Sequence, residues 1–113
     1  MQTVAEVPSF IRRAEKLLSA TERHDLISFL AEHPKAGDLV EDTGGVRKLR
    51  WARGGRGKSG GVRVVYYFHS AGMPLYLLTL YTKAERSNLS RAQKAELASL
   101  TDLLVSLWKD QEP

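Results

Sequence analysis

The sequence predicts an α+β fold in which a mainly antiparallel, twisted sheet carries an N-terminal helical hairpin and a C-terminal helix. Two amphipathic helical stripes near the start are separated by only a short link. Three runs rich in β-branched and aromatic residues follow, joined by glycine-containing turns, and a third helical stripe closes the chain. The expected element order is β-α-α-β-β-β-α. A length of 113 residues predicts one domain, residues 1–113.

The first third of the chain is expected to form a short strand and two helices. Thr3 to Val7 is the expected strand, and Pro8 suits the first turn of a helix because its missing N–H costs nothing there. Two apolar stripes at helical spacing follow, made by Phe10, Ile11, Ala14, Leu17 and Leu18, and then by Leu26, Ile27, Phe29 and Leu30. After the link Ser19–Ala20, Thr21 is the expected N-cap of the second helix. So short a link predicts an antiparallel hairpin.

The middle of the chain is expected to be a loop followed by three strands. Pro34 to Gly45 is the loop, and strands are expected over Val46 to Ala52, Val62 to His69 and Leu75 to Tyr81. The second of these is dense in β-branched and aromatic residues, so both of its faces should be covered. Strands joined by local turns predict an antiparallel meander.

A C-terminal helix is predicted by a capping-box pattern and a broad apolar stripe. Ser90 and Gln93 have the spacing at which each side chain caps the backbone of the other. The stripe behind them consists of Ala95, Leu97, Leu100, Leu103, Leu104, Leu107 and Trp108.

The charges of the chain are strongly segregated. The forty-two residues from Thr43 to Ala84 contain eight of the seventeen basic residues and none of the thirteen acidic ones, so this run carries +8 and the remainder −4. The eight basic residues are Arg47, Lys48, Arg50, Arg53, Arg56, Lys58, Arg63 and Lys83. An ordinary solvated face usually mixes both signs. The run therefore predicts a surface that binds phosphates.

Four of these cations are expected to converge on one patch. Lys48 and Arg50 are two residues apart on one strand and point to the same face. Arg63 lies near the start of the next strand, and Lys83 follows the last one. Four cations so close repel one another unless they are solvated or bridged by an anion. A polar face that serves only solubility is the plainer alternative.

Aromatic residues lie among the cations. Tyr66 and Tyr81 are candidates for contact with nucleotides, because exposed aromatic rings stack on unpaired bases. Core packing is an equal alternative for both. The three histidines, His24, His33 and His69, show no metal-ligand spacing, so we expect no metal and no cofactor.

Three segments carry a resemblance to a known family. They are Gly44-Gly45-Val46-Arg47-Lys48-Leu49-Arg50-Trp51, then Gly57-Lys58-Ser59-Gly60-Gly61-Val62-Arg63-Val64-Val65-Tyr66-Tyr67, then Tyr81-Thr82-Lys83-Ala84-Glu85. Together they resemble the RelE-like toxins of the RelE/ParE superfamily, found in type II toxin–antitoxin systems, and most of all the HigB-type branch. The resemblance covers essentially the whole chain.

The resemblance implies a ribosome-dependent mRNA endoribonuclease that inhibits translation. Such an enzyme cuts mRNA in the ribosomal A site without a metal, through attack of the RNA 2′-hydroxyl on the adjacent phosphate, and leaves a 2′,3′-cyclic phosphate. The family's basic residues correspond to Lys48, Arg50, Arg63 and Lys83. A cognate antitoxin with a helix-turn-helix domain is implied as partner, with DNA bound only indirectly through it.

Roles within the site follow from chemistry. Arg63 is the candidate phosphate clamp, since a guanidinium binds phosphate oxygens bidentately. Lys48 is the candidate for proton transfer, with Glu85 as a second candidate, and Tyr81 orients the nucleotide or donates a proton. Many relatives have a catalytic tyrosine after the last strand that this chain lacks, so the general base stays open. Arg47, Arg53, Arg56, Lys58 and Tyr66 are expected to contact RNA, including ribosomal RNA.

Three other functions remain open at this stage. They are a non-catalytic RNA- or ribosome-binding module, a toxin of the same fold that acts on DNA gyrase, and a pure interaction protein that binds an acidic partner such as an antitoxin. No run approaches the roughly 20 apolar residues of a membrane span. The start of the chain lacks a signal-peptide pattern. We therefore expect a cytoplasmic protein without a membrane partner.

Overall fold

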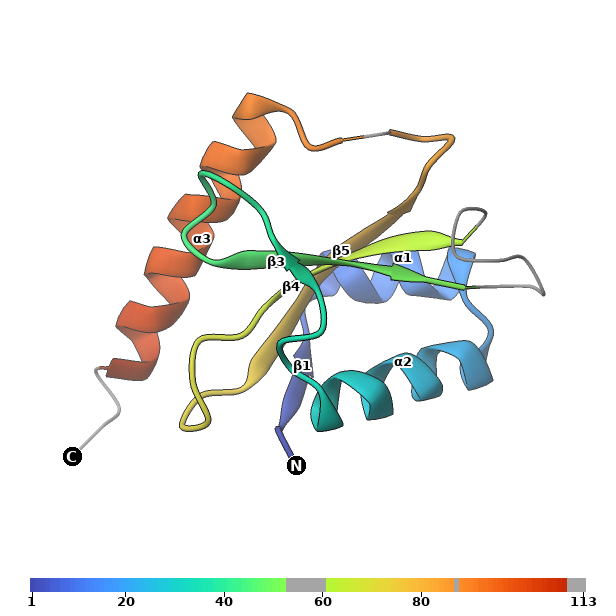
Figure 1. Ribbon diagram of the computed structural model, residues 1–113, viewed down its shortest axis with the longest axis horizontal. Helices are drawn as coiled ribbons and strands as arrows, with labels where there is room; N and C mark the ends of the chain where they lie inside the picture. Colours follow the sequence, from blue (N-terminus) through green and yellow to red (C-terminus); the bar gives the residue numbers. More distant parts are fainter. Residues whose placement is uncertain (53–60, 87, 110–113) are drawn as a thin grey trace.

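A five-stranded mixed sheet forms the centre of the molecule, with helices on both of its faces (Figure 1). The computed structural model describes residues 1–52, 61–86 and 88–109. The elements are β1 (Val4–Glu6), α1 (Pro8–Leu17), α2 (Ala20–Glu32), β2 (Asp38–Leu39), β3 (Val46–Trp51), β4 (Val62–Tyr67), β5 (Leu75–Thr82) and α3 (Arg91–Lys109). The predicted α+β class is confirmed, and a two-residue strand, β2, is added within the expected loop.

The strands lie in the order β1-β5-β4-β3-β2. Strands β2 to β5 pair antiparallel with their neighbours, which confirms the predicted meander, and β1 pairs with β5 in parallel. The pairing of β4 with β5 contains a bulge after Val65, where Val65 faces Thr79 but Tyr66 faces Leu77. Between the bulge and the end of the sheet, Arg63 remains in register with Tyr81.

The helical hairpin covers one face of the sheet. Helices α1 and α2 run in opposite directions (Figure 1). Phe10, Ala14, Leu26 and Leu30 are buried from this side against apolar residues of β4 and β5. The sequence placed the cap of α2 at Thr21, but the cap is Ser19. Its hydroxyl accepts from the Glu22 N–H, and the Glu22 carboxylate accepts from the Ser19 N–H.

Helix α3 packs against the other face of the sheet. Its capping box is confirmed, because the Gln93 N–H donates to the Ser90 hydroxyl and the Ser90 N–H to the Gln93 side chain. Leu104 is buried against this face, but Leu103 and Leu107 are about half exposed. The expected stripe was therefore too broad, since only part of the apolar surface of α3 meets the sheet.

The turn between β2 and β3 is fixed to α3. The buried Thr101 hydroxyl shares its proton between the Ala98 carbonyl oxygen at 2.8 Å and the Thr43 carbonyl oxygen at 3.2 Å. The Thr43 hydroxyl in turn donates to the Val40 carbonyl and accepts from the Val46 N–H. Gly44 has φ +75°, and a Cβ there would lie 2.7 Å from the Thr101 hydroxyl oxygen, so glycine permits this close approach. Strand β2 is thereby held beside β3.

Candidate functional site

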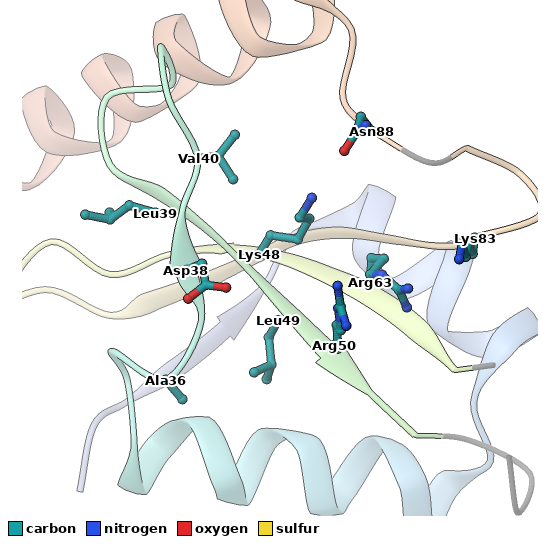
Figure 2. Close-up of a pocket in the computed structure, with 10 residues that line it drawn as sticks. All are labelled: Ala36, Asp38, Leu39, Val40, Lys48, Leu49, Arg50, Arg63, Lys83 and Asn88. Carbon is teal, nitrogen blue, oxygen red and sulfur yellow. The ribbon is translucent and has the colours of Figure 1, made fainter. Parts of the chain in front are cut away.

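A cleft of about 780 Å³ opens on the α3 face of the sheet, between β2, β3, β4 and the segment that follows β5. Its polar lining consists of Asp38, Lys48, Arg50, Arg63, Lys83 and Asn88. Figure 2 shows the four cations on the same side of the sheet, with Leu49 directed to the opposite side. The structure thus brings together the four cations that the sequence predicted to converge.

The pairing of the strands explains why these cations meet. Arg50 on β3 is the register partner of Arg63 on β4, and Arg63 is the register partner of Tyr81 on β5. Lys48 precedes Arg50 by two residues and shares its face. Lys83 comes directly after β5. Side chains in register across strands lie about 5 Å apart at Cβ, so Arg50 and Arg63 are held as neighbours by the backbone.

The described residues that line the cleft include four cations and one carboxylate, so the cleft concentrates positive charge. The salt bridges among the described residues are Arg13 with Glu85 and Arg23 with Glu6, neither of which includes Lys48, Arg50 or Lys83. Arg63 is only 7 % exposed. Like charges opposite each other across two strands destabilise a sheet. An anion in the cleft would offset this repulsion.

The turn that carries Lys83 is fixed to α1. Arg13 donates from Nε to the Leu80 carbonyl at 3.1 Å and pairs with both carboxylate oxygens of Glu85. The backbone N–H and hydroxyl of Thr82 also donate to Glu85. The hydrogen bond from Arg13, followed by that from the Thr82 backbone, lowers the pKa of Glu85 to about 2. Glu85 is thus held by Arg13 and Thr82 and does not line the cleft, which disfavours it as the general base.

Tyr81 lies on the cleft side of the sheet but beneath its surface. The side chain is 1 % exposed, and the Arg86 guanidinium carbon lies 5.0 Å from the centre of its ring. Burial raises the pKa of the phenol, so at neutral pH the hydroxyl carries its proton. Tyr81 is therefore next to the cations, as expected, but does not itself line the cleft.

Of the expected RNA-binding residues, Tyr66 is a correction, and the half-buried Arg47 lies on the face of the sheet opposite the cleft. Tyr66 is fully buried under the helical hairpin, and its hydroxyl accepts from the Gly37 N–H at 2.8 Å. A ring so enclosed cannot stack on a base. The Arg47 guanidinium donates to the Gly37 carbonyl at 2.8 Å and to the Lys35 carbonyl at 3.3 Å. Both side chains hold the segment before β2, on the face opposite the cleft.

The remaining expected contacts, Arg53, Arg56 and Lys58, lie outside the described residues.

Sequence reasoning missed Asp38 and Asn88. Asp38 is the register partner of Lys48 and is the one carboxylate among the described residues that line the cleft. Asn88 stands on the far side of the cleft, between β5 and α3 (Figure 2). A two-residue strand is too short to show periodicity, so no sequence pattern predicted β2. A weak signal was the turn dipeptide Gly37-Asp38 between the second helix and the basic strand.

The described residues contain neither a metal-binding cluster nor a membrane-spanning helix. No group of three or more histidine, cysteine, aspartate or glutamate side chains gathers there in a way that would hold a metal ion. No helix in this part of the chain is long and apolar enough to cross a membrane.

One comparison with known proteins bears on the cleft. A family model described as "RelE toxin of RelE / RelB toxin-antitoxin system" matches residues 10–111 of the 113. The matched range includes all four cleft cations, Asp38 and the whole of α3.

Proposed function

The chain belongs to the RelE toxin family, whose members are toxins of toxin–antitoxin systems with an antitoxin partner, and we propose that it is a ribosome-dependent endoribonuclease that cleaves mRNA. The observation that carries this proposal is the convergence of Lys48, Arg50, Arg63 and Lys83 on one cleft. Cations fixed around an anionic substrate stabilise the additional charge that develops on a phosphate in the transition state. The same residues bind the RNA backbone in the ground state.

The proposed reaction uses the substrate's own 2′-hydroxyl as nucleophile. A base removes the proton of this hydroxyl, its oxygen attacks the adjacent phosphorus, and the bond from phosphorus to the 5′-oxygen breaks. An acid protonates the leaving 5′-oxygen. The products are a 2′,3′-cyclic phosphate and a 5′-hydroxyl, and the step consumes no water and requires no redox partner.

Roles are proposed for the side chains that line the cleft. Arg63, held in register between β3 and β5, clamps the non-bridging oxygens of the scissile phosphate. Arg50 and Lys83 bind the flanking backbone. Lys48 and Asp38 are register partners across the β2–β3 pairing, and they are the groups in the cleft to which we assign proton transfer.

The partners follow from the same chemistry. The substrate is mRNA in the ribosomal A site, and ribosomal RNA meets the surrounding basic surface. The antitoxin, proposed to contain a helix-turn-helix domain, silences the toxin and links it to DNA. The proposed reaction is independent of metal and takes place in the cytoplasm.

Primer extension on an mRNA translated in vitro tests the proposal. Wild-type protein should produce cuts within codons at the A site, and the cuts should require translation. Arg63→Gln should lower the cleavage rate about 100-fold or more. Arg91→Gln is the matched control, because it removes one charge at the exposed start of α3, outside the cleft. Equal loss of activity in both variants would contradict the assignment of Arg63.

Lys48→Arg separates an enzyme from a non-catalytic RNA-binding module. Arginine keeps the positive charge but does not release a proton at neutral pH. If Lys48 transfers a proton, the single-turnover rate falls about 100-fold or more while RNA affinity is retained. If the cleft only binds, the wild-type protein blocks translation without cutting. Cleavage that fails with a chelator and recovers only with a specific transition metal would overturn the metal-free step.

A further inference from the structure

The hydroxyl of Tyr81 is a buried polar group without a hydrogen-bond partner among the described residues. The side chain is 1 % exposed, so bulk water does not serve as the partner. An unsatisfied buried hydroxyl costs stability, and proteins seldom retain one without another use for it. By contrast, the equally buried Tyr66 uses its hydroxyl to accept from Gly37.

The surroundings of Tyr81 specify what partner is missing. Burial favours the neutral phenol and raises its pKa, so at physiological pH the hydroxyl is available as a donor. Arg63 is its neighbour in register, and the Arg86 guanidinium lies over its ring with a separation of 5.0 Å. Both arginines are close enough to act electrostatically on the phenol. A donor between two cations is complementary to an oxyanion.

We propose that Tyr81 and Arg86, beside Arg63, form a second phosphate subsite that takes the RNA backbone phosphate next to the scissile one. The inference rests on the proposed function, which it deepens by adding Arg86 to the binding surface. When RNA binds, the Arg86 guanidinium moves from the ring of Tyr81 onto the phosphate. This proposed movement opens access to the buried phenol, which then donates its hydrogen bond to one of the phosphate oxygens.

The main chain supports this arrangement. The Arg86 N–H donates to the Thr82 carbonyl at 3.2 Å, in the same turn that carries Lys83. Glu85, between them in the sequence, is clamped by Arg13. The backbone on either side of the cleft residue Lys83 is therefore fixed, while the exposed Arg86 side chain is free to turn toward a ligand. One rigid turn thus serves both the cleft and the adjoining subsite.

Tyr81→Phe tests the role of the hydroxyl with two measurements. The probe is a single-stranded 2′-O-methyl RNA trinucleotide, which cannot be cleaved and needs no ribosome. We expect the melting temperature to stay the same or rise, because the removed hydroxyl has no described partner. We expect affinity for the probe to fall roughly tenfold, equivalent to about 1.4 kcal/mol. A lower melting temperature with unchanged affinity would show a structural role and overturn the proposal.

Arg86→Gln tests the subsite through the charge of individual phosphates. Two further probes each carry an uncharged methylphosphonate at one of the two linkages of the trinucleotide. Arg86→Gln should weaken binding of the unmodified probe, but it should have no further effect on one of the two modified probes. Arg91→Gln, with the same loss of charge outside the cleft, should weaken all three probes by the same small factor. Equal effects of both variants on every probe would overturn the subsite.

The outcome is separable from that of the proposed function. Saturable binding that depends on Tyr81 and Arg86, in a protein that does not cut mRNA, would preserve the subsite and reject the enzyme. Cleavage of translated mRNA without any saturable binding of the trinucleotide would support the enzyme and reject the subsite. Shifts of the Tyr81 ring resonances in NMR spectra during titration should accompany binding, because the guanidinium leaves the ring. Unchanged resonances at saturation would contradict that movement.

Discussion

Tyr66→Phe should destabilise the protein without affecting its interaction with RNA. The substitution removes one oxygen atom from a fully buried side chain and leaves the buried Gly37 N–H without its acceptor. Loss of one partner from a buried hydrogen bond costs about 1–3 kcal/mol. For a chain of this length each kcal/mol lowers the melting temperature by about 4 °C, so we expect a fall of roughly 4–12 °C.

The assay compares Tyr66→Phe with Tyr81→Phe, which is the same substitution in another buried tyrosine of the sheet. Urea denaturation gives the free energy of unfolding, and titration with the 2′-O-methyl trinucleotide gives the affinity. Tyr66→Phe should lose stability and keep its affinity, whereas Tyr81→Phe should keep stability and lose affinity. Wild-type stability in Tyr66→Phe, or a selective loss of its affinity, would refute the assignment of Tyr66 to the core.

The two tyrosines also give the stability a dependence on alkaline pH. Burial raises the pKa of both phenols above the ordinary value of 10.0. The unfolded chain releases these protons near pH 10 while the folded protein still holds them. Their contribution to stability is therefore complete below about pH 10 and is lost as the pH rises through the folded-state values. Each phenylalanine variant should show a shallower decline above pH 10 than the wild-type protein.

Three further outcomes are expected. Glu85→Gln should make the stability less dependent on pH in acid. With a pKa of about 2, the carboxylate contributes fully to stability above about pH 4.5 and loses this contribution as the pH falls toward 2. Acid denaturation that is the same in the variant and the wild-type protein would contradict the pairing of Glu85 with Arg13. If the Asp38 carboxylate transfers the proton, Asp38→Asn should slow single-turnover cleavage about 100-fold. RNA affinity should stay the same or rise, because one negative charge is removed from the cleft. An unchanged rate would leave Lys48 as the base. Gly44→Ala should lower the free energy of unfolding by about 1 kcal/mol or more, because φ is +75° and the new Cβ would meet the Thr101 hydroxyl, whereas Gly72→Ala should cost far less in the same urea titration.

The sheet and its cations were predictable because both depend on local rules. Period-two alternation places Lys48 and Arg50 on one face of β3. Local turns place Arg63 on the neighbouring strand β4 and Lys83 directly after β5. The capping box at Ser90 was recognised by its spacing. The same spacing at Ser19 and Glu22 also forms a capping box, although Ser19 is expected in the link between the helices.

The errors at the site have a different physical origin. Strand β4 is buried on both faces, so its composition does not reveal which residues face the helical hairpin. The alternation of side chains along a strand resolves this point, because Arg63 and Tyr66 are three residues apart and therefore point to opposite faces. The same rule separates Arg47 from Lys48. Asp38 was beyond such rules, since its strand is defined by pairing with β3 and by the contact of the following turn with Thr101.

The register of Arg50 against Arg63 connects the stability of the fold to its function. Two like charges held opposite each other cost stability in the free protein, and the surrounding apolar pairs, Trp51 with Val62 and Leu49 with Val64, must offset that cost. A polyanion that contacts both guanidiniums, such as the RNA of the proposed function, would offset this repulsion and stabilise the folded state by mass action. The charge segregation of this sequence therefore favours the binding of an anion in the cleft. The Tyr81 hydroxyl, which is buried without a hydrogen-bond partner among the described residues, is a smaller case of the same kind.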